Sequence, residues 1–254
     1  MIESKVFNSD CLEGMKQYPD KYFELAIVDP PYGINADSNA YKNGINCKAN
    51  GFKEYKKGAW DKGSPEPLYF NELFRISKNQ IIWGANHFIE NISINSTCWI
   101  VWNKVQRGFS FSDAELAWTS LPTTVRVFDY ARGNDSGFAP KLKDHNRAGI
   151  NIHPTQKPVA LYRWLLTNYA KQGDKILDTH LGSGSSRIAA HQLGFDFTGF
   201  EIDEQYFKAS IERFNLVTSQ LSISYSDSDP LKTCQPQYGK GDTNTASSPT
   251  DLLF

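Results

Sequence analysis

A carboxylate, a rigid main-chain carbonyl and an aromatic ring follow one another in Asp29-Pro30-Pro31-Tyr32, directly after the apolar run 23–28. The two prolines lack N–H donors and restrict the residue before them to extended conformations, so neither a helix nor sheet pairing continues. The pattern predicts that Asp29 and the Pro30 carbonyl stand at the carboxyl end of a strand. Active sites of open α/β sheets lie at such ends.

Two acceptors beside a ring suit an exocyclic amino group on a nucleobase, which presents two N–H donors and a flat face. Acceptors that hold both N–H bonds favour a more tetrahedral nitrogen, whose lone pair can then attack an electrophile. The base must leave the duplex to be reached. A proline turn that simply ends a strand is the alternative interpretation of the same four residues, so other segments have to decide between the two.

A second candidate site lies near the end of the chain, where Lys175-Ile176-Leu177-Asp178 precedes Gly182-Ser183-Gly184-Ser185-Ser186 and the apolar run 188–190. This order predicts a strand, a glycine loop and a helix whose first amides face a ligand. Glu201 ends a further predicted strand nineteen residues after Gly182. An acid at that offset is placed to bind ribose hydroxyls.

The glycine loop does not fit a nicotinamide site. Arg187 replaces the third glycine of the dinucleotide pattern, where a large side chain crowds the contact between helix and strand. A nucleoside ligand without phosphates fits better, and S-adenosylmethionine is such a ligand.

Two more segments carry candidate ligands of the same cofactor. The segment 153–158 reads His-Pro-Thr-Gln-Lys-Pro and precedes an amphipathic helix. We expect Thr155 or Gln156 to cap that helix, with its free amides and Lys157 seating a small carboxylate. Asp10 can cap the helix that begins at Cys11, or accept a hydrogen bond from a cofactor's adenine or ribose, and one aspartate can do both.

The segment 33–67 loses all periodicity and interleaves lysines with aromatic residues. Residues 33–65 carry six lysines against three acids. We predict a mobile loop that orders on DNA, because lysines neutralise phosphates and aromatic rings stack on displaced bases; a solvated surface loop is the alternative. The basic residues predicted to contact DNA are Lys42, Lys53, Lys56, Lys57, Arg107 and Arg132.

Composition predicts one soluble domain. The 254 residues suffice for one substantial core, and the net charge of −1 gives no global signature of a nucleic-acid binder. The four cysteines lack metal-ligand spacing, which favours a reducing cytoplasm. We find no signal peptide and no apolar run long enough to cross a membrane, so we expect a cytoplasmic protein. His87 is interpreted as a structural histidine.

The remaining patterns predict the other elements. Helices are expected over about 11–19, 66–77, 158–169 and 206–217, and strands over 4–8, 23–28, 80–84, 97–102, 113–118, 124–128, 174–178 and 197–200. We assign 1–217 to one catalytic domain, with a catalytic half over about 1–130 and a cofactor-binding half over about 150–217. Residues 218–254 are polar and predicted to be disordered.

The motifs Asp29–Tyr32, 153–158 and 177–185 occur in that order. In this the chain resembles the β-group of DNA amino-methyltransferases, most closely the phage and prophage members, over residues 5 to 215. The resemblance implies a Rossmann-like, class I methyltransferase α/β fold. It has a seven-stranded, mostly parallel sheet with helices on both faces and a circularly permuted motif order.

By resemblance the activity is S-adenosylmethionine-dependent transfer of a methyl group to adenine N6 in double-stranded DNA, with a flipped target base. Cytosine N4 stays open as the alternative, and so does a catalytically silent DNA-binding regulator. Ring-carbon methylation is disfavoured because no cysteine follows a proline. The implied catalytic residues are Asp29, Pro30, Pro31 and Tyr32. The implied cofactor ligands are Asp10, Cys11, Asp29, His153, Thr155, Gln156, Lys157, Asp178, Gly182, Ser183, Gly184, Ser185, Ser186 and Glu201.

Three further expectations concern departures and partners. Thr179-His180-Leu181 stands where many relatives have Pro-Phe-x, so a phenylalanine ring that packs near the cofactor is lost. Relatives are often dimers, which makes a homodimer an expectation by analogy. The last four residues, 251–254, faintly resemble the terminal peptide of bacterial sliding-clamp ligands, against the simpler interpretation of an unstructured end.

Overall fold

The computed structural model describes residues 2–34, 63–92, 94–107, 112–131, 152–153 and 155–224. The strands are β1 Ser4–Asn8, β2 Phe23–Val28, β3 Ser77–Trp83, β4 Trp99–Asn103, β5 Ala114–Thr119, β6 Arg126–Asp129, β7 Lys175–Asp178 and β8 Asp196–Glu201. The helices are α1 Cys11–Met15, α2 Pro67–Ile76, α3 Val159–Tyr169, α4 Ser185–Leu193 and α5 Glu204–Ser224, with short 3₁₀ turns η3 Ala85–His87 and η4 Ile89–Asn91.

The strands form one eight-stranded sheet within the described ranges, in the order β1-β8-β7-β2-β3-β5-β4-β6. Every neighbouring pair is parallel except the two that involve β5, which runs against β3 and β4. The predicted α/β fold with a mostly parallel sheet is confirmed. The predicted number of seven strands is wrong, because the chain after β5 returns parallel to β4 and adds an edge strand.

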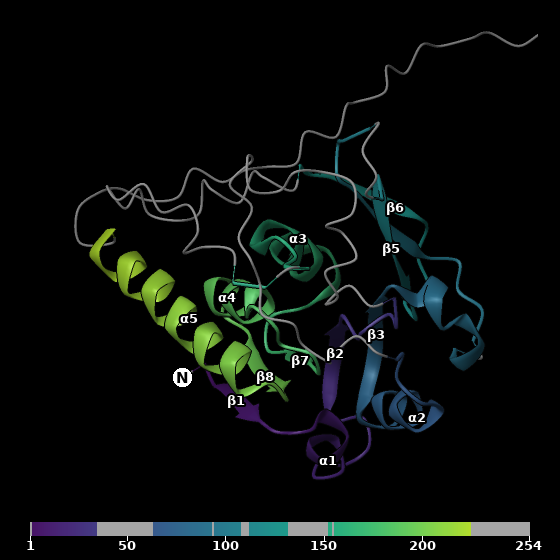
Figure 1. Ribbon diagram of the computed structural model, residues 1–254, viewed down its shortest axis with the longest axis horizontal. Coiled ribbons are helices and arrows are strands. Elements are labelled where there is room, and N and C mark those ends of the chain that lie inside the picture. The colour runs from purple at the N-terminus through teal and green to yellow at the C-terminus, as the bar shows by residue number, and fades with distance from the viewer. Residues whose placement is uncertain are drawn as a thin grey trace, which may run out of the picture.

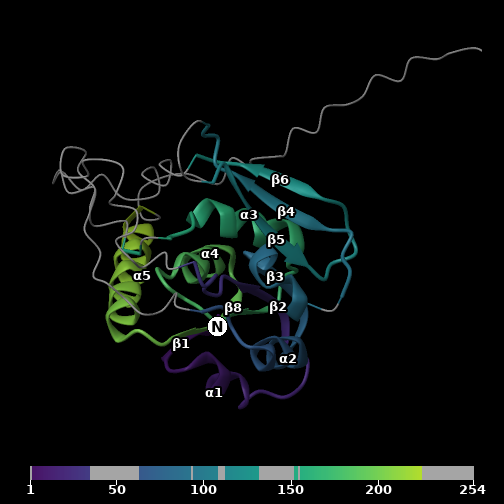
Figure 2. The ribbon, with the colours of Figure 1, turned by 45° about the vertical axis from the view of Figure 1, so that its right-hand side comes forward.

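Helices cover both faces of the sheet, as Figure 1 and the turned view in Figure 2 show. In β2, Leu25 and Ile27 enter the core cluster that contains α3 and α4, while Ala26 and Val28 enter the cluster beneath α1 and α2. Successive side chains of a strand point to opposite faces, so a central strand covered on both sides needs an unbroken apolar run. The sequence of β2 is such a run.

The order of the strands brings together segments that are about 150 residues apart in the chain. β2 lies between β3 and β7, and Leu25 and Ala26 pair with Ile176 and Leu177. Both strands run in the same direction, so their carboxyl ends meet at one edge of the sheet. Asp29 follows the first and Asp178 ends the second, which places the two predicted motifs side by side.

The reversed strand β5 contributes to the same edge with its other end. Because β5 is antiparallel to β3 and β4, its first residues lie level with the last residues of its neighbours, and Ala114 pairs with Asn103. Glu115, the second residue of β5, therefore lies on the side of the sheet that carries Asp29. β6 is the outermost strand on one side of the sheet, and apolar side chains are exposed on it at Val127, just before it at Val125 and on β5 at Leu116.

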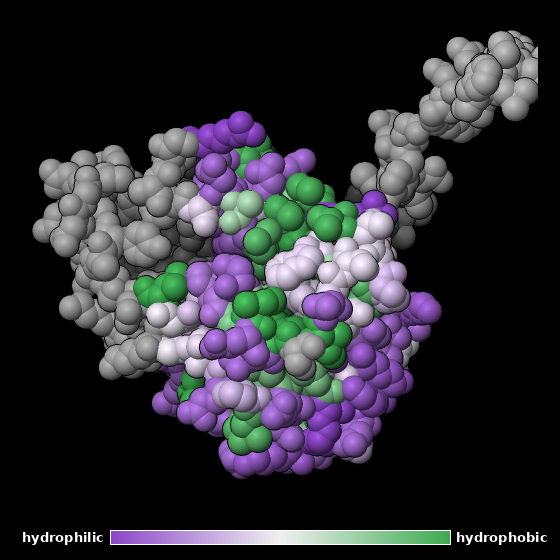
Figure 3. Space-filling view, turned by 90° about the vertical axis from the view of Figure 1, so that its right-hand side faces the viewer, coloured by the Kyte–Doolittle hydropathy of each residue, from purple (hydrophilic) through white to green (hydrophobic). Residues whose placement is uncertain are grey.

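The polarity of the surface differs between two parts of one face of the molecule. Figure 3 views it from the side of β5 and β6. Apolar surface gathers in the upper and middle parts of this view, whereas the lower part, where α1 and α2 lie, is largely polar. No helix in the described ranges is long and apolar enough to span a membrane.

Some helix ends differ from the prediction; α1, for instance, ends at Met15 and not near residue 19. α3 has Pro158 as its N-cap and no side-chain cap, because Thr155 bonds to His153 Nδ1 and Gln156 Oε1 accepts from the Ile152 N–H. The predicted cap by Thr155 or Gln156 is therefore wrong. α5 continues to Ser224, beyond the expected end at 217, so the predicted disorder of 218–224 is also wrong.

Candidate active site

The turn after β2 holds its aspartate through side chains. Tyr32 donates its hydroxyl hydrogen to Asp29 Oδ1 over 2.7 Å. The Tyr32 ring lies on Gly84, where an added Cβ would come within 2.0 Å of Tyr32 Cε1. Gly84 also has a φ of +67°, which favours glycine. A glycine at the end of β3 is thus what lets the Tyr32 ring settle beside the carboxylate.

Lys157 reaches this turn from the start of α3. Its Nζ lies 2.5 Å from Asp29 Oδ1 and 3.2 Å from the Tyr32 hydroxyl oxygen, and its side chain is 3% exposed. The sequence predicted Lys157 as a seat for a cofactor carboxylate. That role stays a prediction; in this structure the buried ammonium has the partly buried carboxylates of Asp29 and Glu115 as partners.

The electrostatics of the turn follow from burial. Burial raises the pKa of Asp29, and the neighbouring Lys157 ammonium opposes that rise without cancelling it. Burial alone would lower the pKa of Lys157, but Asp29 and Glu115 outweigh it and raise the pKa. The charged form of Lys157 is therefore favoured, and its ammonium is the main influence that opposes the rise in the pKa of Asp29.

The glycine loop is organised by Asp178. This buried carboxylate accepts from the His180 N–H over 3.0 Å and from the Ser186 hydroxyl over 2.5 Å. Gly182 and Gly184 have φ angles of +50° and +72°, and Gly184 is the N-cap of α4. Burial raises the pKa of Asp178 to about 7, although both hydrogen bonds oppose the rise. Asp178 therefore fixes the conformation of the glycine loop by accepting hydrogen bonds from residues on both sides of it.

Glu201, at the end of β8, is fixed in the same way. One oxygen accepts from the Gly182 N–H over 2.8 Å and the other from the Asp203 N–H over 2.9 Å. Burial raises its pKa. The carboxylate ties the glycine loop to the neighbouring strand end.

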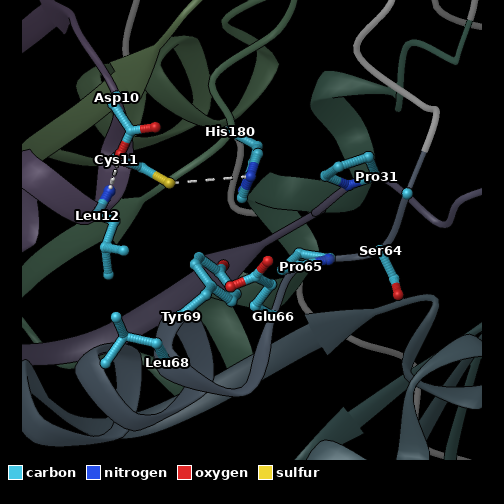
Figure 4. Close-up of a pocket in the computed structure, with 11 residues that line it drawn as sticks. Asp10, Cys11, Leu12, Pro31, Ser64, Pro65, Glu66, Leu68, Tyr69 and His180 are labelled. Carbon is cyan, nitrogen blue, oxygen red and sulfur yellow. Dashed lines mark hydrogen bonds between the residues drawn. The ribbon is translucent and has the colours of Figure 1, made fainter.

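A cavity of about 250 Å³ lies between the two motifs. In Figure 4, Asp10 and Cys11 face Tyr69 across it, with His180 of the glycine loop and Pro31 of the catalytic turn beside them. Asp10 caps α1 through Oδ1, which accepts from the Leu12 and Glu13 N–H groups. The predicted cap is confirmed, and the same residue also lines the cavity.

A ring is present where the sequence suggested that one was lost. The His180 ring lies 5.4 Å from the Tyr69 ring at 65° and within 4.0 Å of Cys11 Sγ. Thr179 Oγ1 bonds both His180 Nδ1 and the Tyr69 hydroxyl, over 2.9 and 2.6 Å. Burial lowers the pKa of His180 to about 4, so the ring is neutral near pH 7. A neutral imidazole takes the place of the phenylalanine.

Comparison with known proteins decides the family. Residues 23–212 match a family described as DNA methylase, which is named for N6 and N4 methyltransferases. This match spans most of the chain. The chain belongs to the DNA methylase family.

The methylase is similar to type II methyltransferases. It is 25% identical to M2.MboI of Moraxella bovis over 87% of this chain and 90% of that protein. It is 24% identical to M2.DpnII of Streptococcus pneumoniae over 81% and 87% of the two chains.

Solved structures share its fold. The complex of M1.HpyAVI with S-adenosylmethionine superposes with a TM-score of 0.53 at 18% identity, over 85% of this chain and 100% of that one. The cytosine-N4-specific PvuII methyltransferase gives a TM-score of 0.53 at 13% identity, over 89% and 93%. These likenesses confirm the Rossmann-like methyltransferase fold.

The other residues of the predicted site lie around the glycine loop of the methylase. His153 approaches Gly182, since a Cβ there would lie 4.0 Å from the His153 ring, and the ring meets Tyr206 edge-on at 4.4 Å. Burial lowers the pKa of His153 to about 4. Ser183 and Ser185 share a buried hydrogen bond over 3.1 Å and contact Arg213.

Sequence reasoning missed several residues that the fold brings to the site. The exposed His87 ring stacks on Tyr32, with centroids 4.9 Å apart and an interplanar angle of 14°. Tyr69 lines the cavity, and Glu115 contacts Lys157. His87 and Glu115 could have been noticed in the sequence, because both are ionisable residues close to an end of a predicted strand.

The predicted DNA contacts are largely outside the described ranges. Arg107 is exposed shortly after β4. Lys42, Lys53, Lys56, Lys57 and Arg132 lie outside the described residues, as do most of the predicted loop 33–67 and residues 225–254 with the predicted clamp-binding tip.

Proposed function

We propose that this methylase transfers a methyl group from S-adenosylmethionine to the N6 amino group of adenine in DNA. The observation that carries the proposal is the position of the Asp29 turn. It stands at the end of β2, directly beside β7 and its glycine loop, and Pro31 and His180 line one cavity between them.

The residues around that cavity fit the cofactor. Tyr69, His180 and Cys11 offer a largely uncharged wall for an adenine ring, and Asp10 and Glu201 place carboxylates near the ends of β1 and β8 for an amino group and ribose hydroxyls. No added side chain is tolerated without strain at Gly182 or Gly184, where the backbone approaches the ligand. The loop itself is held by Asp178 and Glu201, so it is preorganised.

When bound, the cofactor supplies a methyl group on a sulfonium, which is electrophilic. Asp29 and the Pro30 carbonyl accept the two N–H bonds of the base amino group, and Tyr32 packs on the base. The amino nitrogen, held by these acceptors, would take the methyl group while the sulfonium leaves as a neutral thioether, and the displaced proton would pass to the Asp29 carboxylate that accepts the N–H bond. Catalysis comes from positioning and from fixed acceptors in a site that excludes water.

Cytosine N4 is the second candidate, because the same two acceptors suit its amino group. The fold shared with the cytosine-N4-specific PvuII methyltransferase supports it. Aspartate as the first residue of the motif favours adenine by resemblance. The similarity to type II methyltransferases supports a site-specific enzyme of a bacterial or phage restriction–modification system, working on double-stranded DNA in the cytoplasm with its target base flipped out.

One digestion experiment tests the proposal. Purified protein is incubated with methyl-labelled cofactor and unmethylated double-stranded DNA, and the DNA is digested to nucleosides and separated. We expect label in N6-methyl-2′-deoxyadenosine. Label in N4-methyl-2′-deoxycytidine would select the second candidate, and DNA binding with no labelled nucleoside would identify the protein as a silent DNA-binding regulator.

A further inference from the structure

Two buried and two partly buried charges form a continuous chain that ends at the aspartate of the proposed catalytic motif. Lys104 Nζ lies 2.8 Å from Glu115 Oε1, and Glu115 Oε2 lies 3.2 Å from Lys157 Nζ. Lys157 Nζ in turn lies 2.5 Å from Asp29 Oδ1. The exposed fractions of these side chains are 6%, 23%, 3% and 19% in that order. We call these residues, Lys104, Glu115, Lys157 and Asp29, the charge chain.

The strand directions explain why the four residues of the charge chain meet. Lys104 follows β4 and Asp29 follows β2, so both stand at carboxyl ends of parallel strands. Glu115 joins them only because β5 is reversed and starts at that edge. Lys157 arrives from the turn before α3, on top of the same edge.

Aromatic rings replace water around the two ammonium groups. Lys104 Nζ lies 5.5 Å from the centroid of the Trp102 ring, and Lys157 Nζ lies 5.4 Å from that of Trp83. A cation over a ring is stabilised by the negative face of the ring, more so when it is desolvated. The ammonium groups are therefore held between carboxylates and rings, which fixes their positions.

Glu115 is the fixed anion in the middle. Burial would raise its pKa, but Lys157 and Lys104 outweigh burial and lower it to about 2. Glu115 is thus ionised at any pH at which the protein works. Removing one member of a buried set of opposite charges leaves its partner uncompensated. The two positive and two negative charges of the chain balance.

The two carboxylate oxygens of Asp29 differ in their contacts. Lys157 and Tyr32 both bond to Oδ1. Oδ2 is therefore the oxygen that can turn to an amino group of a base without breaking either bond. An ammonium so close also favours the ionised carboxylate, which is the form that accepts hydrogen bonds.

We infer that Glu115, anchored by Lys104, is a positioning residue for the methylation reaction: it holds the Lys157 ammonium at Asp29 Oδ1, and Lys157 in turn favours the ionised form of Asp29 and leaves Oδ2 to face the base. This inference rests on the proposed function. Glu115 touches neither base nor cofactor in this role. It acts through Lys157, and it moderates the pull of Lys157 on Asp29 by sharing the ammonium.

Other groups act on Asp29 from the surrounding elements, and the test has to leave them in place. They are Tyr32 in the same turn, Tyr69 of α2, Tyr162 of α3 and Asp178 of β7. The tyrosines are neutral, because burial raises the pKa of each of them well above its usual value. Lys157 is the cation of this set.

Two substitutions separate positioning from mere structural support. K157M removes the ammonium, so the acid limb of the pH profile of kcat should move up by about 1–3 pH units, the effect of an opposite charge at this range. E115Q removes a like charge near Asp29, so the acid limb should move down, by a smaller amount. In both variants kcat should fall more than the KM for S-adenosylmethionine rises, and K157R should restore the limb.

A matched control is available on the same strand. Glu24 of β2 also bridges two partners, with Oε1 2.9 Å from Lys78 Nζ and Oε2 accepting from the Lys175 N–H over 2.9 Å. It lies at the opposite end of β2 from Asp29. E24Q should leave the acid limb where it is in the wild type.

Direct titration of Asp29 separates this inference from the proposed function. With ¹³C-labelled aspartate, the Asp29 carboxyl signal, assigned with D29N, is followed against pH without DNA. The carboxyl pKa should rise in K157M and fall in E115Q. Those opposite shifts with no methyl transfer by the wild type would overturn the proposed function alone.

An acid limb that stays fixed or moves the same way in folded K157M and E115Q would overturn the inference. So would higher kcat in K157M, which would make Lys157 a competitor of the base. If K157M does not fold, K157M/E115Q keeps the charges of the chain balanced, and its acid limb should lie above that of the wild type. A limb at or below the wild-type position there would also overturn the inference.

Discussion

The two motifs that meet at the edge of the sheet hold their carboxylates in opposite ways. In the glycine loop, Glu201 is bound by two main-chain N–H groups, and Asp178 by one N–H and one short hydroxyl side chain. In the catalytic turn, Asp29 is bound by the ends of two long side chains, Lys157 and Tyr32. Both arrangements are buried and both satisfy the carboxylates.

The difference indicates a division of labour. Main-chain partners cannot leave without unfolding the loop, so we expect the glycine loop held by Asp178 and Glu201 to be the rigid part of the proposed cofactor site. Side-chain partners can shift by rotation about single bonds, so Asp29 can exchange or share its partners when a base arrives. Binding is thus supported by backbone geometry and the chemical step by exchangeable charges. The following substitutions test that division.

The largest effect is expected for Asp29. D29A removes the acceptor while leaving the glycine loop intact, so methyl transfer should fall by at least about 10²–10³-fold, the scale of losing one fixed catalytic hydrogen-bonding group. The dissociation constant of S-adenosylmethionine should stay within a few-fold of the wild-type value. Calorimetric titration beside the labelled-cofactor assay measures both. Full activity in D29A would reject the assignment of the site.

Asp178 should show the reverse pattern. D178N keeps the shape but weakens two hydrogen bonds, so the cofactor should bind roughly tenfold less tightly, since a charged acceptor contributes about 1.5 kcal/mol more than a neutral one. The decrease in kcat at saturating cofactor should be small. Isothermal titration of the cofactor checks this, and a larger loss in kcat than in affinity would contradict the division.

The same variant tests the raised pKa of Asp178. Its pKa rises from 3.8 to about 7 on folding, so ionisation opposes the folded state. The free energy of unfolding of the wild type relative to D178N should be greatest below pH 4, fall as pH rises to 7 and level off above it, by up to about 4 kcal/mol. Urea denaturation across this pH range measures the difference. A constant difference would show that folding does not shift the pKa of Asp178.

His87 should give a smaller effect. Its ring stacks on Tyr32, so H87A should loosen the orientation of Tyr32 and lower kcat by roughly threefold to tenfold, the scale of one aromatic stacking contact. Steady-state kinetics on a short duplex measures it. Higher activity in H87A would instead mean that the imidazole occupies the place of the target base.

The smallest effect is expected at His180. H180A removes a neutral ring from the cavity wall, so the cofactor should bind roughly threefold less tightly, and H180F should recover most of the loss. Because the pKa of His180 is about 4, the loss should be the same at pH 6 and pH 8. Equilibrium binding at both values checks this. A loss that grows toward pH 6 would show that a charged imidazole takes part.

Much of this architecture could be predicted from local patterns. The unbroken apolar run of β2, the prolines that end it and the glycines of the loop are each constrained by their own backbone, so they indicate structure wherever they occur. The cap by Asp10 is similarly local. The motif order then implied the fold through resemblance. The local patterns also indicated all eight strands, β6 included, whereas the number of seven came from the resemblance alone.

The partners of charged side chains could not be predicted in that way. The sequence by itself determined that a carboxylate, two prolines and a ring end one strand, and that a glycine loop and an acid follow another. Only the tertiary structure decided that Lys157 turns to Asp29, that Glu115 links it to Lys104, and that His180 serves as a neutral ring. The physical reason is that a buried charge takes whichever opposite charge shares its place at the edge of the sheet, and the reversal of β5 set that choice.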